Sequence, residues 1–270
     1  KSGSQVPAMK PYRVATDDFD PDTSDRPAVA MHLDWANYEV EVPSHKHRKG
    51  QLILALRGAV TCMAAGGIWI VPPQCGVWVP GGITHSNRAT TNARLSALFV
   101  EPGAAALPDH CCTLSISPMI REMIGRLAGS SIDYGPDSHT ARLVRVLLDE
   151  LSLMPEEQLN LPVSDHPKIR QIAKALTTNP ADRRTLADWA TRVALSERSL
   201  TRLMIQETGL TFGRWRQQLQ PIVALRELAG GAAVQQVSDT LGYESVTAFI
   251  LMFKKALGQT PARYFAKRPI

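Results

Sequence analysis

Short apolar runs separated by Gly or Pro pairs constrain the fold of this chain more than any other feature. They occupy residues 52–56, 60–65, 68–71, 77–80 and 95–100. Runs of five or six residues, with turn residues at regular spacing, are typical of strands in an antiparallel sandwich or small barrel. We therefore expect an N-terminal β-barrel over residues 29–112.

The hydrophobic period becomes helical after Pro102. Two apolar stripes, with spacings of three and four residues, predict amphipathic helices at 115–128 and 139–152. We expect residues 113–160 to form a helical dimerisation and linker region, because these stripes exceed what the rim of a small barrel would cover. The prolines of segment 154–167 break the period and indicate a domain boundary.

The lengths of the apolar runs and the spacing of the cysteines argue against a membrane protein and against a disulfide-linked one. Residues 1–28 are polar and carry five aspartates and four prolines, which predicts a flexible arm. No apolar run approaches the roughly 20 residues of a membrane span, so we expect no membrane association and a cytoplasmic location. The four cysteines show no CxxC spacing, which favours reduced packing thiols over disulfides or a cysteine-based metal site.

Charge is distributed unevenly between the two halves of the chain. Residues 1–165 hold 14 basic and 18 acidic side chains, net −4, whereas residues 166–270 hold 16 basic and 7 acidic ones, net +9. A basic module of about a hundred residues predicts a polyanionic partner for the second half alone.

Three histidines and one glutamine form the first candidate site. His45 and His47 are two residues apart at the start of an expected strand, so both imidazoles should share one face. If the barrel brings His85 and Gln51 to them, the four side chains could bind Zn, Fe, Mn or Ni. Two other interpretations remain: the polar lining of an effector pocket without metal, or simple hydrogen-bonded histidines.

The spacing of these residues resembles the cupin family, which has a first motif G(x)5HxH(x)3-4E(x)6G and a second containing PxG(x)2H(x)3N. The segment HKHRKGQ with Gly58 matches the first motif from the histidines onward, and the segment PGGITH, residues 80–85, matches the middle of the second. Gln51 stands where the carboxylate ligand is usual, and Asn87 follows His85 by two residues rather than four. A neutral amide leaves a divalent ion without an anionic protein ligand, which lowers metal affinity or favours an anionic small molecule.

A candidate helix-turn-helix unit lies in residues 185–210. Apolar stripes predict two short helices, joined by a tight turn at 194–196, and Ser196 can cap the second helix. The outward face of that second helix then carries Arg198, Thr201, Arg202 and Ile205. An exposed basic and polar helix face is what insertion into a DNA major groove requires.

The arrangement recurs about 48 residues later. Gly242 suits a helix end, Ser245 caps the next helix, and we expect its buried stripe to hold Phe249, Met252, Phe253 and Ala256. The candidate DNA-contacting residues are the cap and the outward side chains: Ser245, Val246, Thr247, Leu251 and Lys254. An all-helical dimerisation bundle with a solvated basic face would explain neither the duplication nor the two turns.

The segment GYES-(x)3-F-(x)3-FKKALGQTPARYF, residues 242–265, resembles the C-terminal motif of the AraC/XylS family of bacterial transcription regulators. The likeness covers about residues 168–266 and, with the cupin motifs, about 85% of the chain. It implies two helix-turn-helix units in an all-α domain at 166–270, joined by a long helix at about 212–229. It also implies that both recognition helices enter successive major grooves.

One departure from the family pattern lies in the joining helix. Family members commonly have Arg-Leu where this chain has Gln220 and Pro221. A proline inside a helix removes a backbone hydrogen bond and costs roughly 3 kcal/mol, so we expect a kink there. The kink would affect how both recognition helices reach adjacent grooves.

The sequence therefore predicts an α+β protein: a cupin-like barrel, then helices, then an all-α domain with two helix-turn-helix units. The expected function is a transcription regulator that binds double-stranded promoter DNA, and RNA polymerase if it activates. A small-molecule effector or metal in the barrel would control it, and a homodimer is expected. The rival interpretation is a metal-dependent cupin oxygenase or isomerase tethered to DNA. Gln51 argues against an enzyme, and Glu39 and Glu41 offer no decisive acid or base.

Overall fold

The computed structural model describes residues 19–34, 41–72, 75–157 and 159–266. Its strands are β1 (Ala28–Asp34), β2 (Glu41–His45), β3 (Gly50–Arg57), β4 (Val60–Ala64), β5 (Gly67–Val71), β6 (Cys75–Val79), β7 (His85–Ala89), β8 (Arg94–Val100), β9 (Cys112–Ser115), β10 (Glu156–Glu157) and β11 (Asn160–Pro162). Its helices are a 3-10 turn at Pro21–Thr23, then α1 (Pro118–Ala128), α2 (His139–Leu151), α3 (Pro167–Thr178), α4 (Leu186–Arg192), α5 (Glu197–Thr208), α6 (Phe212–Gly230), α7 (Val234–Thr240), α8 (Val246–Leu257) and α9 (Pro261–Ala266). All five expected apolar runs are strands.

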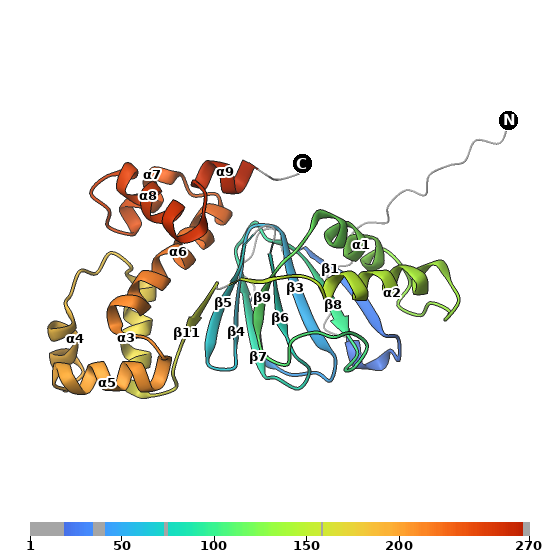
Figure 1. The fold of residues 1–270 in the computed structure, drawn as a ribbon, viewed down its shortest axis with the longest axis horizontal. Helices are drawn as coiled ribbons and strands as arrows, with labels where there is room; N and C mark the ends of the chain where they lie inside the picture. Colours follow the sequence, from blue (N-terminus) through green and yellow to red (C-terminus); the bar gives the residue numbers. More distant parts are fainter. Residues whose placement is uncertain (1–18, 35–40, 73–74, 158, 267–270) are drawn as a thin grey trace.

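Two antiparallel sheets form the N-terminal domain (Figure 1). The first has the strand order β1-β8-β3-β6-β9-β10 and the second the order β11-β5-β4-β7-β2. Alternating residues from both sheets, among them Ile53, Val60, Val71 and Phe99, form one buried cluster between them. The predicted mixed fold with an N-terminal antiparallel β-domain is confirmed.

Helices α1 and α2 cover the outer face of the six-stranded sheet, and Figure 1 shows them on the opposite side of the sheets from the C-terminal helices. Their apolar stripes, including Ile120, Ile124 and Leu147, pack into one cluster with Leu52 and Leu98 of the sheet. The stripes are therefore already covered within one chain. The reasoning that left them for a dimer interface was wrong, because strand alternation also gives this sheet an apolar outer face.

The expected flexible arm at 1–28 is wrong for its last ten residues, while residues 1–18 lie outside the described part. Phe19 packs its ring on Phe99 with centroids 5.6 Å apart, and Pro21 is buried. The Asp22 carboxylate accepts the backbone N–H groups of Arg48 and Lys49 at 2.6 and 3.1 Å. Specific tertiary contacts thus hold a segment whose composition looks disordered.

The sheets extend beyond residue 112, where we expected the barrel to end. Strand β9 pairs with β6, and β10 and β11 add to the edges of the two sheets, at β9 and β5. Segment 154–167, expected to be only a boundary, therefore contributes two strands. No helix in the described part of the chain is long and apolar enough to cross a membrane.

The C-terminal helices share one core around α6. This cluster holds the buried side chains of Trp189, Trp215, Phe249 and Phe253. Ala256, which we expected in the buried stripe of α8, is exposed. In the last turn of α8 it is Leu257 that packs partly against the core, and Ala256 faces solvent.

Candidate DNA-binding face and ligand site

The second helix of the first unit, α5, begins as predicted. The Ser196 hydroxyl accepts the N–H of Ser199 at 3.1 Å, which caps the helix, and Gly209 ends it with φ of 71°. Buried Leu200 and Met204 hold its inner face against the domain core. The opposite face is therefore free to meet a partner.

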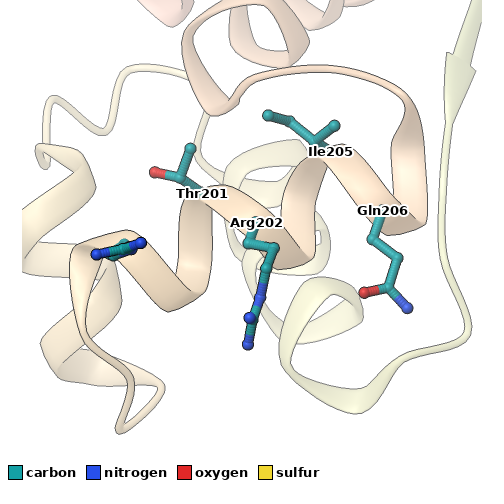
Figure 2. Close-up of a pocket in the computed structure, with 5 residues that line it drawn as sticks. Thr201, Arg202, Ile205 and Gln206 are labelled. Carbon is teal, nitrogen blue, oxygen red and sulfur yellow. The ribbon is translucent and has the colours of Figure 1, made fainter.

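That opposite face bounds an open surface hollow of about 600 Å³. Figure 2 shows side chains of α5 projecting into it, and its lining residues are Arg198, Thr201, Arg202, Ile205 and Gln206. The three predicted contact residues thus share one face. Gln206 was missed, although its spacing of four from Arg202 places it on the same helix face. Its amide has the donor and acceptor pair that matches the major-groove edge of adenine.

The second unit repeats this geometry on α8. The Ser245 hydroxyl accepts the N–H of Ala248 at 3.2 Å, so this predicted contact residue is also the helix cap. Thr247, Leu251 and Lys254 are exposed, with 63% of Leu251 accessible, whereas Val246 is half-buried. An exposed leucine beside threonine and lysine suits contact with thymine methyl groups and phosphates.

Hydrogen bonds tie the turn of the second unit to the rest of the domain. The Arg183 guanidinium donates to the Gly242 carbonyl and lies 6.0 Å from the ring centroid of Tyr243. The Tyr243 hydroxyl in turn donates to Gln220 Oε1 at 2.5 Å. Gln220, which departs from the family pattern, therefore anchors the second turn to α6. Pro221 is buried inside α6, which is one continuous helix from Phe212 to Gly230.

The structure brings the three predicted histidines together at one end of the two-sheet domain. Their ring centroids are 4.3 Å apart for His45 and His85, 5.1 Å for His47 and His85, and 5.8 Å for His45 and His47. One ligand nitrogen from each lies within 4.8 Å of the others. The two-residue spacing does not act within one strand as expected: His45 ends β2, and His47 lies in the connection before β3. The site forms where the two sheets meet.

Each imidazole is oriented by a backbone carbonyl. Nδ1 of His45 donates to Pro43 at 2.8 Å, Nδ1 of His47 to Lys49 at 2.5 Å, and Nδ1 of His85 to Ile83 at 2.9 Å. A carbonyl only accepts, so Nδ1 carries the proton. In a neutral ring the Nε2 lone pair then remains for a ligand, which is the orientation found in metal-binding histidines.

Gln51 lies between two of these rings. Its Oε1 is 3.2 Å from Nε2 of His47 and 2.7 Å from Nε2 of His85. Burial, with smaller contributions from the neighbouring imidazoles, lowers the pKa of His85 to about 4. His85 is therefore neutral at pH 7, and its Nε2 lone pair faces an amide oxygen. This contact becomes favourable if both atoms coordinate a cation, or if Gln51 presents its amide N–H instead.

A buried lysine holds the strand that carries Gln51. Lys49 is fully buried, and its ammonium donates to Glu101 Oε2 at 2.5 Å and to the Arg26 carbonyl at 3.0 Å. Burial lowers the pKa of Lys49, and neighbouring Arg48 adds to the effect. Glu101 is partly exposed, but without it the buried Lys49 ammonium would keep only the Arg26 carbonyl as a partner, so this pair fixes the start of β3.

The Pro80-Gly81-Gly82 turn holds His47 and His85 close to each other. The Gly82 N–H donates to the His47 carbonyl at 2.8 Å. A Cβ on Gly81 would lie 1.9 Å from the Arg48 carbonyl oxygen, so only glycine permits this approach. The segment that resembled the second cupin motif therefore acts through backbone packing as well as through its histidine.

The N-terminal two-sheet domain and the C-terminal domain contact each other along α6. Trp215 Nε1–H donates to the Pro162 carbonyl at 2.8 Å, and the Gln218 amide donates to the Asn160 carbonyl at 2.5 Å. A cavity of about 570 Å³ lies between the five-stranded sheet and α6. Glu41, the upstream carboxylate considered for catalysis, lines this cavity in an ion pair with Arg88 at 2.6 Å, and Glu39 lies outside the described residues.

Comparison with known protein families agrees with this geometry. Residues 189–267 match a family described as a helix-turn-helix domain, and residues 32–157 match one described as an AraC-like ligand binding domain. The fold and the site thus define a DNA-binding transcription regulator with an N-terminal ligand-binding domain.

The sequences of similar proteins show which family the chain belongs to. The chain is 50% identical over 256 residues to the HTH-type transcriptional regulator NimR of Escherichia coli K12, and the alignment covers 95% of this chain and 94% of the relative. It is 28% identical over 210 residues to the regulator RipA of Corynebacterium diphtheriae, covering 66% and 63%. The chain belongs to the AraC family of transcriptional regulators. These relatives are named as regulators, in agreement with the expectation of a non-enzyme.

Among solved structures, ToxT from Vibrio cholerae O395 aligns with 88% of this chain and 96% of its own, with a TM-score of 0.39 and 8% identity.

Proposed function

We propose that this regulator binds promoter DNA under the control of a small ligand held at the histidine site, with a divalent transition metal ion as its anchor. The observation that carries the proposal is the shared orientation of His45, His47 and His85. All three place Nδ1 on a backbone carbonyl and leave Nε2 for a ligand. Zn, Fe, Mn and Ni all accept imidazole nitrogen, and Gln51 Oε1 supplies a fourth donor.

The charge of the site favours an anionic or polar ligand on that metal. None of its four donors is anionic, so a divalent ion keeps its full charge. Asn87, two residues after His85 on β7, is buried, and its Oδ1 has no hydrogen-bond partner among the described residues. Alternation along β7 places Asn87 on the same face of the strand as His85, so a ligand with both a carboxylate and a hydrogen-bond donor would serve both groups.

Metal analysis of the purified full-length protein tests the anchor. We expect His47→Ala to carry about one divalent ion per chain fewer than the wild type. Protein that carries no ion from metal-replete cells, and whose DNA binding responds to an effector equally well after His47→Ala, would contradict the metal. The trio would then line the effector pocket, with the Gln51 amide donating to both rings.

For DNA, we propose that α5 and α8 are the two recognition helices. Arg198, Thr201 and Arg202 would read one major groove, and Ser245, Val246, Thr247, Leu251 and Lys254 the next. Selection of duplexes from a random library by the full-length protein tests this. We expect a site with two specified segments about one helical turn, or about 10 base pairs, apart. A single specified segment would contradict simultaneous insertion.

We also propose a homodimer, and contact with RNA polymerase if the protein activates. The surface left on the helical region carries Met119 and Val146, each 50% exposed, and Leu153, 73% exposed. Light scattering of the full-length protein should give a dimer that Val146→Asp weakens. A monomer at micromolar concentration would contradict this.

A further inference from the structure

A second cluster of metal-binding side chains lies at the edge of the six-stranded sheet, away from the histidine trio. It consists of His110, two residues before β9, Cys112, the first residue of β9, and Glu156, the first residue of β10. One ligand atom from each lies within 4.8 Å of the others. Tetrahedral zinc, with bonds of about 2.0 to 2.3 Å, needs donors roughly 3.5 Å apart, so small side-chain movements close this triad around an ion.

The surroundings of His110 orient it as a ligand. Its Nδ1 lies 3.2 Å from Asp109 Oδ1, and its Nε2 lies 3.2 Å from Glu156 Oε2. A carboxylate on Nδ1 fixes the tautomer and directs Nε2 to the metal, as is common for zinc-binding histidines. Asp109 therefore fixes the tautomer with the proton on Nδ1, and Glu156 lies on the Nε2 side of the ring, where an ion would bind.

The two adjacent cysteines differ in direction, which explains why only one belongs to the cluster. Cys112 packs with the residues beneath α1 and α2, whereas Cys111 packs against the cluster between the two sheets. The two side chains therefore pack on opposite sides of the six-stranded sheet. The Cys112 thiol is buried, while His110 and Glu156 are partly exposed, so an ion would enter from solvent and reach the sulfur last.

We propose that His110, Cys112 and Glu156 form a zinc site with a fourth position open to water. Nitrogen, sulfur and carboxylate oxygen are donors that zinc accepts together. The ion would join residues 46 positions apart, on either side of the α1–α2 region. It would also hold β10 to β9 just before the chain enters the DNA-binding domain.

Cobalt replacement on the full-length protein tests the site. Co²⁺ bound to a thiolate gives a near-ultraviolet charge-transfer band that the histidine trio, which has no sulfur donor, does not produce. We expect this band in the wild type, its displacement by Zn²⁺, and its loss in Cys112→Ser. Cys111→Ser is the matched control and should keep the band.

Three exposed positions keep the proposal testable if Cys112→Ser folds poorly. Glu156→Gln and His110→Ala should each weaken Co²⁺ binding at least about tenfold, and Asp109→Asn by about tenfold. Glu157→Gln, one residue along the same strand, should leave binding unchanged. No thiolate band in the wild type, a band that survives in Cys112→Ser, or equal affinity of Glu156→Gln and Glu157→Gln would overturn the proposal.

Discussion

Replacing Gly81 with alanine should destabilise the N-terminal two-sheet domain and disrupt the histidine site together. The new Cβ would lie 1.9 Å from the Arg48 carbonyl oxygen and 3.0 Å from its carbon. Backbone cannot rotate away as a flexible side chain can, so the turn must separate from the segment that carries His47. That movement also stretches the hydrogen bond from the Gly82 N–H to the His47 carbonyl, now 2.8 Å long.

The magnitude follows from these two effects. Forcing extra volume into a packed site costs about 1 to 3 kcal/mol, and the lost backbone bond about 0.5 to 1.5 kcal/mol more. We therefore expect a loss of about 2 to 4 kcal/mol. At about 2 to 4 °C per kcal/mol for a domain of this size, the melting temperature should fall by roughly 5 to 15 °C.

Gly82→Ala is the matched control. Gly82 has φ of +80°, but a Cβ there would meet nothing within 4 Å. Alanine at this position pays only the left-handed backbone penalty of about 1 to 2 kcal/mol. Thermal unfolding and metal or effector binding should be measured on both variants. Equal melting temperatures, or unchanged binding in Gly81→Ala, would refute the close approach as the reason for this glycine.

Three further predictions concern other parts of the molecule. Pro221→Ala should stabilise the protein by less than about 1 kcal/mol and tighten DNA binding. Removing the proline recovers its cost of roughly 3 kcal/mol inside a helix, but most of this gain is lost because two buried methylenes disappear and the unfolded chain becomes freer. Unchanged melting temperature and unchanged DNA affinity would contradict this prediction. Gln51→Glu should tighten metal binding by adding an anionic ligand, which titration calorimetry would measure; weaker binding would count against the metal. Arg202→Glu should weaken binding more at some base positions than at others, whereas Lys255→Glu should act uniformly and lower the salt slope, which anisotropy against selected and randomised duplexes would show.

The strands and the helix-turn-helix units could be predicted because their signals are local. Runs such as 52–56 and 77–80 already have strand length and turn residues on both sides. Ser196 and Ser245 mark helix starts through hydrogen bonds that span only three residues. Short-range patterns of this kind determine elements almost independently of the rest of the chain.

The elements that were not predicted depend on distant partners. Strands β10 and β11 are two and three residues long, and each exists only because β9 and β5 offer an unpaired edge. Residues 19–27 are ordered by contacts such as that of Asp22 with the backbone near residue 48, 26 positions away. Polarity and proline content describe the isolated segment, and neither reveals that a sheet edge lies next to it.

The candidate ligand site shows the same division. Residue types and motif spacing identified His45, His47, His85 and Gln51, and the structure brings all four together. Spacing within one strand was the wrong reason, however, because the donors come from β2, the connection after it, β3 and β7. What joins them is the Gly82 to His47 hydrogen bond and the buried Lys49 to Glu101 pair. The residue types of the site can therefore be predicted from local sequence, while its geometry is set by contacts between segments that no local pattern connects.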